Sequence, residues 1–341
     1  MAASIKDVAK RAGVSISTVS RVLNGTAKVD AAKEAAVREA VCFYSYEPNL
    51  FGRGLVKQRT EMIGVYFQEG LSPLDRTYDL ELLKGAQEVL AAEGYSAVIL
   101  TDAGCRKDPA PVFYKYIREK RIDGLLLSGL PDRIRKDPAF SGLMDSGFPV
   151  TYIGQSIHTA GMNVYAQFVE YHINMLRVLH DLGHRKILLR YFETHAHYIR
   201  QIAEQAASEF PDLTLNPETA SGGISPTVLR NEHCVQGFTA VCCPDIRDAE
   251  RVISACAQMG ISVPGDLSVM AVEHRPDEGT NVYPQISAVY VPAREMGRCA
   301  GRQLLDALRL GAQAERYREF HADLRLRGST ESKIQLPEDS K

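Results

Sequence analysis

Near the start of the chain, apolar residues recur at the spacing of two short amphipathic helices. In the first, over residues 5–12, they follow the i, i+3, i+4, i+7 pattern of one buried helix face. These apolar positions are Ile5, Val8, Ala9 and Ala12. Gly13 follows, and glycine is the residue that ends a helix in a left-handed turn without steric cost. The pattern therefore predicts a helix and a tight turn.

A second helix is predicted over residues 16–24, with Ser15 as its N-cap. Its inward positions are Val19, Val22 and Leu23, which leaves a small-polar and basic face of Ile16, Ser17, Ser20, Arg21 and Asn24. In a helix-turn-helix, the N-terminal part of the second helix meets the base edges of DNA. Arg21 can bond guanine in a bidentate fashion, and Ile16 can pack on a thymine methyl group. The stretch predicts a DNA reader; the alternative is a solvated helical hairpin without a partner.

A third helix is predicted from about Asp30 to Tyr44, followed by a linker that begins near Pro48. From residue 61 onward, short apolar runs alternate with helical patterns, which is typical of parallel sheets covered on both faces. The predicted strands are 62–67, 95–100, 124–128, 150–153, 186–191, 239–243, 267–272 and 286–291. The predicted helices between them include 79–93, 111–120, 168–181, 245–259 and 294–310. With a break after Gln155, this predicts two doubly wound subdomains and a ligand cleft at the carboxyl ends of their strands.

Charge is distributed unevenly along the chain. Residues 1–60 carry ten Lys and Arg against five Asp and Glu, a net of +5, whereas residues 61–341 carry 30 against 37, a net of −7. A basic head on an acidic body favours contact of the head alone with phosphates. The seven cysteines include no Cys-x-x-Cys pair, and the chain has neither an apolar leader nor an apolar run of about 20 residues. We expect a cytoplasmic protein with reduced thiols and no membrane partner.

The chain resembles transcriptional regulators of the lactose/galactose repressor (LacI/GalR) family. Motifs in the family's order cover nearly the whole chain. They are Asp7-Val8-Ala9 with Val14-Ser15, Thr18 to Asn24, Tyr46-Glu47-Pro48-Asn49, Ile63-Gly64-Val65, Arg121-Ile122-Asp123-Gly124, Leu182-Gly183-His184-Arg185, Val263 to Val269, and Arg327-Gly328-Ser329-Thr330. The resemblance implies a homodimer that binds a palindromic operator, most often as a repressor controlled by a small-molecule effector.

The implied fold is an N-terminal all-α helix-turn-helix domain followed by an α/β core like that of a periplasmic binding protein. We expect the helix-turn-helix domain over 1–48, a hinge over 49–60 and the ligand-binding and dimerisation core over 61–341. The chain is expected to cross three times between the subdomains of this core. The N-subdomain would comprise about 61–157 and 291–320, and the C-subdomain about 158–290 and 321–331. The tail after Thr330 lacks heptads, so a coiled-coil tetramer is not expected.

The family's hinge forms a helix pair on the operator, and Leu55 occupies the position of the leucine that wedges into the central base step. The alternative for Leu55 is an ordinary linker residue. The residues expected at the DNA are Ile5, Ser15, Ile16, Ser17, Thr18, Ser20, Arg21, Asn24, Lys28, Asn49, Arg53 and Leu55.

Effector contacts are nominated from the polar and aromatic residues that follow the predicted strands. They are Tyr78, Asp79, Asp102, Ser128, Gln155, Asn163, Tyr165, Arg200, Asp245, Glu273 and His274. Tyrosine faces with carboxylates and amides suit a sugar or another polar metabolite. The family's acid and arginine after the fourth strand are here Gly154 and Gln155, however, so the pattern departs from a typical sugar clamp. His274 is interpreted either as a pH-sensitive ligand contact or as an ordinary partly buried histidine.

The sequence contains few motifs that would indicate other function classes. His195 and His197 stand two residues apart, either as a metal pair on a strand or as part of a solvated loop, and no further ligand stands at a diagnostic spacing. The sequence contains no Gly-x-Ser-x-Gly, Walker or Gly-x-Gly-x-x-Gly motif, so neither an enzyme nor a cofactor is expected. A sugar-binding transport receptor is the competing class, and the basic head and missing leader favour the regulator.

The hinge departs from the family at Gly52 and Gly54, where better helix formers are usual. Each glycine disfavours a helix by about 1 kcal/mol relative to alanine. Gly52→Ala and Gly54→Ala are therefore expected to strengthen operator binding, as measured by fluorescence anisotropy. Unchanged or weaker affinity in both variants would contradict a glycine-weakened hinge.

Overall fold

The computed structural model describes residues 3–25, 28–46, 59–67, 76–102, 110–130, 132–154, 161–220, 224, 229–311 and 315–333. The expected hinge contacts Asn49, Arg53 and Leu55, and the expected effector contact Gln155, lie outside these residues.

The N-terminal head is a three-helix unit with its own small core. Its helices are α1 (Ile5–Ala12), α2 (Ile16–Asn24) and α3 (Ala31–Tyr44). Gly13 has a left-handed φ of 64° at the turn, and Ser15 Oγ accepts a hydrogen bond from the Thr18 backbone N–H. Asp30 caps α3 in the same way. Val8, Val19 and Val37 are fully buried between the three helices, so the predicted periodicity and caps are confirmed.

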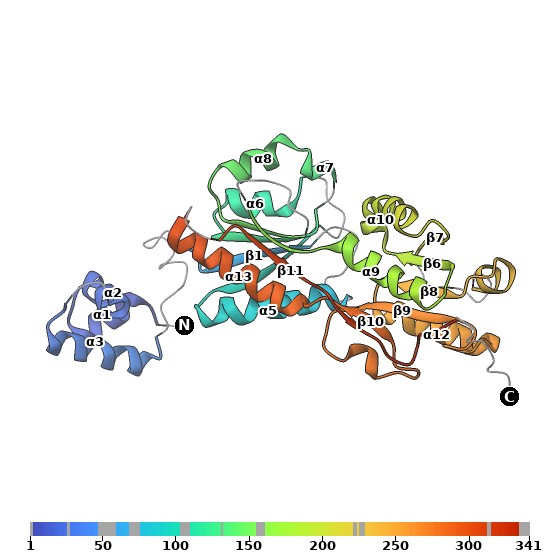
Figure 1. Ribbon diagram of the computed structural model, residues 1–341. Coiled ribbons are helices and arrows are strands. Elements are labelled where there is room, and N and C mark those ends of the chain that lie inside the picture. Colours follow the sequence, from blue (N-terminus) through green and yellow to red (C-terminus); the bar gives the residue numbers. More distant parts are fainter. Residues whose placement is uncertain are drawn as a thin grey trace, which may run out of the picture.

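The core contains two six-stranded sheets, which Figure 1 shows as two groups of strands flanked by helices. The first has the order β11-β5-β4-β3-β1-β2, with all adjacent strands parallel. Its strands are β1 (Met62–Phe67), β2 (Ser96–Thr101), β3 (Gly124–Ser128), β4 (Val150–Ile153), β5 (Met162–Ala166) and β11 (Tyr317–Phe320). The helices of this subdomain are α5 (Thr77–Ala92), α6 (Val112–Arg118), α7 (Asp132–Arg135), α8 (Pro138–Asp145) and α13 (Ala293–Leu310).

The second sheet has the order β12-β10-β9-β8-β6-β7, and only the β10–β12 pair is antiparallel. Its strands are β6 (Lys186–Tyr191), β7 (Thr214–Thr219), β8 (Ala240–Cys243), β9 (Ser268–Glu273), β10 (Ser287–Tyr290) and β12 (Asp323–Arg325). Its α-helices are α9 (Phe168–Asp181), α10 (Ala196–Glu209) and α12 (Ile246–Met259). This subdomain also contains the short helical segments η1 (Glu193–His195), η2 (Asn231–Val235) and η3 (Glu278–Thr280).

The chain passes from one sheet to the other three times: between β5 and α9, between β10 and α13, and between β11 and β12. The first passage follows Ala166, later than the expected break after Gln155. The reason is β5, which pairs with β4 and buries Met162 and Val164 in the first subdomain. Its residues were expected to belong to the second subdomain.

Among the strands of the described residues, β5, β7, β11 and β12 were not predicted from the sequence; β7, β11 and β12 lie at sheet edges, whereas β5 lies between β4 and β11. β7 contains Pro217 and β12 has three residues, so neither shows an apolar run. The segment with His195 and His197 was interpreted as a strand or a loop, and this is wrong. Glu193–His195 forms the turn η1, and His197 lies in the first turn of α10.

Helices α5 and α13 lie side by side and touch through their backbones (Figure 1). A Cβ atom on Gly85 would lie 1.9 Å from the carbonyl oxygen of Arg294, and one on Gly297 would lie 2.1 Å from that of Leu82. Only glycine fits at these two positions. On the exposed side of the same contact, Glu88 pairs with Arg294 and Arg298.

We expect Gly85→Ala to destabilise the core, because backbone atoms cannot move aside for the added methyl group. The expected loss in the free energy of unfolding, measured by urea denaturation, is about 1–3 kcal/mol or more. Gly142→Ala is the matched control: Gly142 lies in α8 with nothing within 4 Å of its Cβ position, so a gain of about 0.5–1 kcal/mol is expected. Equal changes in the free energy of unfolding for the two substitutions would contradict a tight backbone contact between α5 and α13.

Candidate functional site

The outward face of α2 offers side chains suited to the major groove of DNA. Ile16 is 44% exposed despite being apolar, and Ser17 and Arg21 are exposed beside it. The Ser15 hydroxyl lies 2.8 Å from the hydroxyls of both Ser17 and Thr18, so three short polar side chains are held together at the start of the helix. Such a helix start also attracts phosphate groups, because its free N–H groups carry partial positive charge.

The other expected DNA contacts differ in exposure. Lys28 is exposed, while Thr18 and Ser20 are half-buried. Ile5 is half-buried and packs on the core of the head, so its apolar surface is partly used there. Asn24 ends α2, and its side chain lies outside the described part. The guanidinium carbon of Arg11 lies 3.4 Å from the Phe43 ring centroid, which commits this cation to packing on α3.

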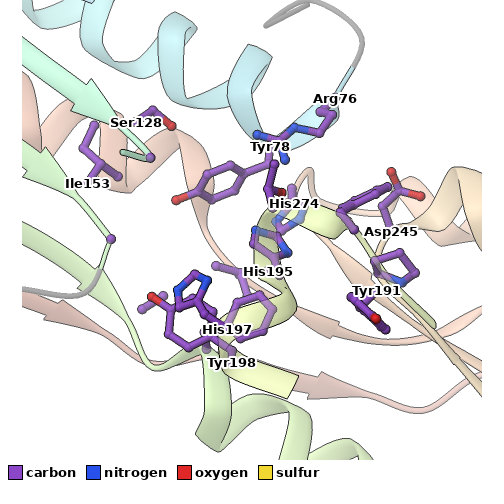
Figure 2. Close-up of a pocket in the computed structure, with 18 of the residues that line it drawn as sticks. Arg76, Tyr78, Ser128, Ile153, Tyr191, His195, His197, Tyr198, Asp245 and His274 are labelled. Atoms are coloured by element: carbon purple, nitrogen blue, oxygen red, sulfur yellow. The ribbon is translucent and has the colours of Figure 1, made fainter. Parts of the chain in front are cut away.

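A cavity of about 390 Å³ lies between the two subdomains. Figure 2 shows how its lining residues converge from different elements: Tyr78 from α5, Ser128 from the end of β3, His195 and Tyr198 from η1 and α10, and His274 after β9. The carboxyl ends of parallel strands thus supply much of the lining, as this fold class favours.

Half of the ten described residues expected to contact an effector line this cavity: Tyr78, Ser128, Tyr165, Asp245 and His274. Asp79 lies directly behind them, buried, and accepts hydrogen bonds from Ser128 Oγ at 3.2 Å and Arg76 Nε at 2.7 Å. Burial raises the pKa of the Asp79 carboxyl, and Arg76 opposes this shift. Asp79 therefore orients two lining residues and does not line the cavity itself.

The other four expected residues do not line the cavity, and three of them have structural partners. Asp102 accepts hydrogen bonds from Tyr66 Oη and the Val112 N–H, which secures the start of α6. Asn163 Nδ2 donates to the carbonyl oxygens of Tyr152 and Gly154. Glu273 pairs with Arg327 at 2.8 Å.

Arg200 is exposed on α10 and is also absent from the lining. In a helix, side chains one or two positions apart point in different directions, so the burial of Tyr198 and Ile199 turns Arg200 outward. Asp102 and Glu273 stand at the carboxyl ends of β2 and β9 as expected, but their side chains point away from the cavity, whereas Asn163 lies near the start of β5 and Arg200 lies within α10.

The most prominent lining groups, the aromatic rings from 168 to 198, were not predicted. Phe168 has its ring centroid 4.3 Å from His172, 4.6 Å from His195 and 4.7 Å from Tyr198, onto which it stacks at 25°. A sequence signal exists: after β6, the run from Tyr191 to Tyr198 holds five aromatic or imidazole rings at the carboxyl end of a strand.

The buried imidazoles of the cavity are neutral at pH 7. Desolvation lowers the pKa of His172 to about 4, with an opposing hydrogen bond to the Phe168 carbonyl. Desolvation, together with the charge of Arg76, lowers the pKa of His274 to about 3 and that of His195 well below its usual value. His274 Nδ1 and Thr194 Oγ1 are buried in the cavity wall and have no hydrogen-bond partner among the residues that the structure describes. Such atoms are costly unless something satisfies them.

The N-terminal end of α5 and the residue before it also touch the second subdomain directly. Thr77 Oγ1 donates to Glu278 Oε1 at 2.7 Å, and the Tyr78 ring meets the His274 ring edge-on at 4.9 Å. Arg76 lies 5.9 Å from the Phe192 ring centroid. The two subdomains are thus joined at the edge of the cavity by contacts that any change in their relative orientation would alter.

Comparison with known proteins identifies both parts of the chain. Residues 4–49 match the family model described as bacterial regulatory proteins, lacI family. Residues 176–330 match a periplasmic binding protein-like domain. The chain thus combines a LacI-family DNA-binding domain with a periplasmic binding protein-like domain.

Relatives with assigned functions match nearly the whole length of the chain. It is 28% identical to the HTH-type transcriptional repressor PurR of Pectobacterium atrosepticum, covering 94% of this chain and 95% of the relative. It is 25% identical to the ribose operon repressor of Bacillus subtilis, covering 92% and 94%. These relatives are repressors and not enzymes, in agreement with the absence of catalytic motifs.

Solved structures show the same fold. The lac repressor dimer bound to operator and an anti-inducer superposes with a TM-score of 0.79 at 19% identity, covering 97% of this chain and 100% of that one. A LacI-family regulator from Silicibacter pomeroyi gives a TM-score of 0.78 at 19% identity, with 96% and 99% covered. The expected two-part fold is therefore confirmed.

Among the described residues, no group of three or more His, Cys, Asp or Glu side chains is arranged to hold a metal ion. No helix within the described ranges combines the length and apolar character that crossing a membrane requires.

Buried neutral histidines predict that acid destabilises the protein. The unfolded chain takes up a proton on His172 near pH 6.5, whereas the folded protein does so only near pH 4. The free energy of unfolding therefore falls as the pH drops from 6.5 toward 4, because in this window the unfolded chain binds a proton on His172 and the folded protein does not. Above pH 6.5 His172 is neutral in both states and causes no such loss. In His172→Phe, the slope of unfolding free energy against pH in this window should fall by up to about 1.4 kcal/mol per pH unit.

The measurement is urea denaturation at closely spaced pH values. His321→Phe is the matched control, since the His321 side chain is exposed. A slope unchanged by His172→Phe would contradict a buried, neutral His172.

Proposed function

We propose that the protein is a cytoplasmic transcriptional repressor that binds a palindromic operator as a homodimer and responds to a small molecule in the interdomain cavity. The observation that carries this proposal is the outward face of α2, where an exposed Ile16 and an exposed Arg21 lie beside a row of short hydroxyl side chains. An exposed apolar side chain next to a free guanidinium is what base-edge recognition in the major groove requires.

The basic charge of the head supports the same function. Residues 1–60 carry a net charge of +5 and the remainder −7, so phosphate attraction acts on the head while the body is repelled. Phosphate contacts would position α2, and Arg21, Ile16 and Ser17 would read the bases.

Dimerisation is inferred from the size of the head and from relatives. Three short helices with one small core offer few base contacts, and two copies on a two-fold axis double them at a symmetric site. The lac repressor, with the same fold, is a dimer on its operator.

Effector control follows from the position of the cavity. A ligand there would touch both subdomains, because Tyr78 and Ser128 belong to the first and His195 and His274 to the second. Binding would favour one relative orientation of the subdomains, and this orientation sets how the two heads are presented to DNA. That is a coupling between two sites in the thermodynamic sense.

Substitution of Arg21 tests operator reading. Arg21→Ala should lower affinity for the operator by about 1–3 kcal/mol per half-site, while weak, salt-dependent binding to random DNA remains. The operator would first be selected from genomic fragments, and affinities measured by fluorescence anisotropy at several salt concentrations.

Arg38→Ala is the matched control, because Arg38 is an exposed arginine of the same head whose guanidinium is paired with Glu34 on α3. Its operator affinity should change far less than that of Arg21→Ala. Failure of the unmodified protein to select any palindromic fragment would contradict the proposed function.

A further inference from the structure

The interdomain cavity is lined by rings to an unusual degree. Eight Tyr and Phe and four His residues are among its lining side chains. Five of these rings form one continuous group around Phe168, with neighbouring centroids 4.3–5.3 Å apart. Tyr78 approaches from the other subdomain, and Figure 2 shows its ring and those of His195, His197 and Tyr198 around a shared space. Offset and edge-on ring contacts at these distances are the ones that aromatic groups favour.

Several polar side chains of the described wall already have hydrogen-bond partners within the protein. The described lining residues include no Asn or Gln. Arg135 donates to Tyr152 Oη and to the Leu130 carbonyl, Arg76 is paired with Asp79, and Asp245 Oδ1 accepts from the Asp248 N–H at the start of α12. A sugar would require many precisely placed partners, because each buried hydroxyl without one is unfavourable. The wall provides broad apolar faces instead.

Two buried polar atoms of the described wall can bind a ligand. His274 is 8% exposed, and its Nδ1 has no hydrogen-bond partner among the described residues. The buried Oγ1 of the half-buried Thr194 likewise has none among them. Both line the second-subdomain side of the cavity. A flat ligand between the rings could complete one or two hydrogen bonds at its edge through these atoms, which is how such pockets fix orientation.

We propose that the ligand of this cavity is a planar aromatic or heteroaromatic metabolite, held between the Phe168 ring group and Tyr78 and anchored at its edge by His274 and Thr194. This inference rests on the proposed function, in which the cavity holds the effector. It replaces the sugar-like effector expected from the sequence with a different ligand class.

The test uses the full chain and three probe classes in thermal-shift and titration calorimetry experiments. Adenine and 2-naphthoate are planar aromatic probes. Decahydro-2-naphthoate matches 2-naphthoate in size and charge but lacks the aromatic ring. Ribose and glucose represent sugars. We expect saturable stabilisation by adenine and 2-naphthoate, at least tenfold tighter than by the saturated acid, and none by the sugars.

The chain contains no tryptophan, so a bound probe can also be followed by its own near-ultraviolet absorption. Stacking against Phe168 and Tyr198 should lower the absorbance of 2-naphthoate, and Phe168→Leu should abolish that change. His274→Phe keeps the ring but removes its nitrogens, so it should weaken adenine at least tenfold while sparing 2-naphthoate. Tyr283→Leu is the matched control, because Tyr283 is 95% exposed and does not line the cavity.

The outcomes separate this inference from the proposed function. Binding of sugars with no response to planar probes would overturn the inference and leave effector control standing. No response to any probe would also overturn it, while operator selection by the same preparation would leave the DNA-binding function intact. Equal binding of 2-naphthoate and its saturated analogue would show that the rings act only as apolar surface, which likewise contradicts the inference.

Discussion

The backbone contact between α5 and α13 is the constraint on which the cavity depends. Gly85 and Gly297 allow two helices, separated by about 200 residues of sequence, to approach until carbonyl oxygens occupy the places of missing side chains. Helix α5 begins at Thr77. Because this helix is tightly packed, it holds Arg76, Thr77 and Tyr78 in place in the cavity wall. Helix α13 begins directly after the passage from the second sheet, with Val291 and Met296 in the cavity wall. One contact therefore fixes the first-subdomain side of the site.

The contacts across the cavity are of a different kind from those within each subdomain. The sheets are held by continuous buried apolar surface, whereas the subdomains meet at the cavity edge through a hydroxyl on a carboxylate, two rings edge-on and a cation above a ring. Interactions of this kind contribute about 0.5–1.5 kcal/mol each, so they can be exchanged for contacts with a ligand. A ligand shifts such an equilibrium only by its difference in affinity for the two arrangements.

The cavity wall also contains groups that lower the stability of the folded protein. Burying His172 and His274 in neutral form is unfavourable for the folded chain alone, as is leaving His274 Nδ1 and Thr194 Oγ1 with no hydrogen-bond partner among the described residues. Elsewhere in the described part of the chain, His184 is the one other buried histidine. Unfavourable groups gathered at one place, facing a space between two subdomains, are what a binding site is expected to contain.

The sequence by itself determined the elements whose signals are local. The head follows from helical periodicity, Gly13 and the caps Ser15 and Asp30, because each of these acts within one helical turn. β3 and β9 follow from apolar runs that only a doubly covered strand can bury. What only the tertiary structure decided was the assignment of β5 to the first sheet and the partners of the polar residues at strand ends. Asp102, Asn163 and Glu273 turned inward to Tyr66, Tyr152 and Arg327, while Phe168, His195 and Tyr198 formed the wall of the cavity. The reason is physical: a side chain's hydrogen-bond partner or stacking neighbour can lie far along the chain, and its identity depends on which elements fold against each other.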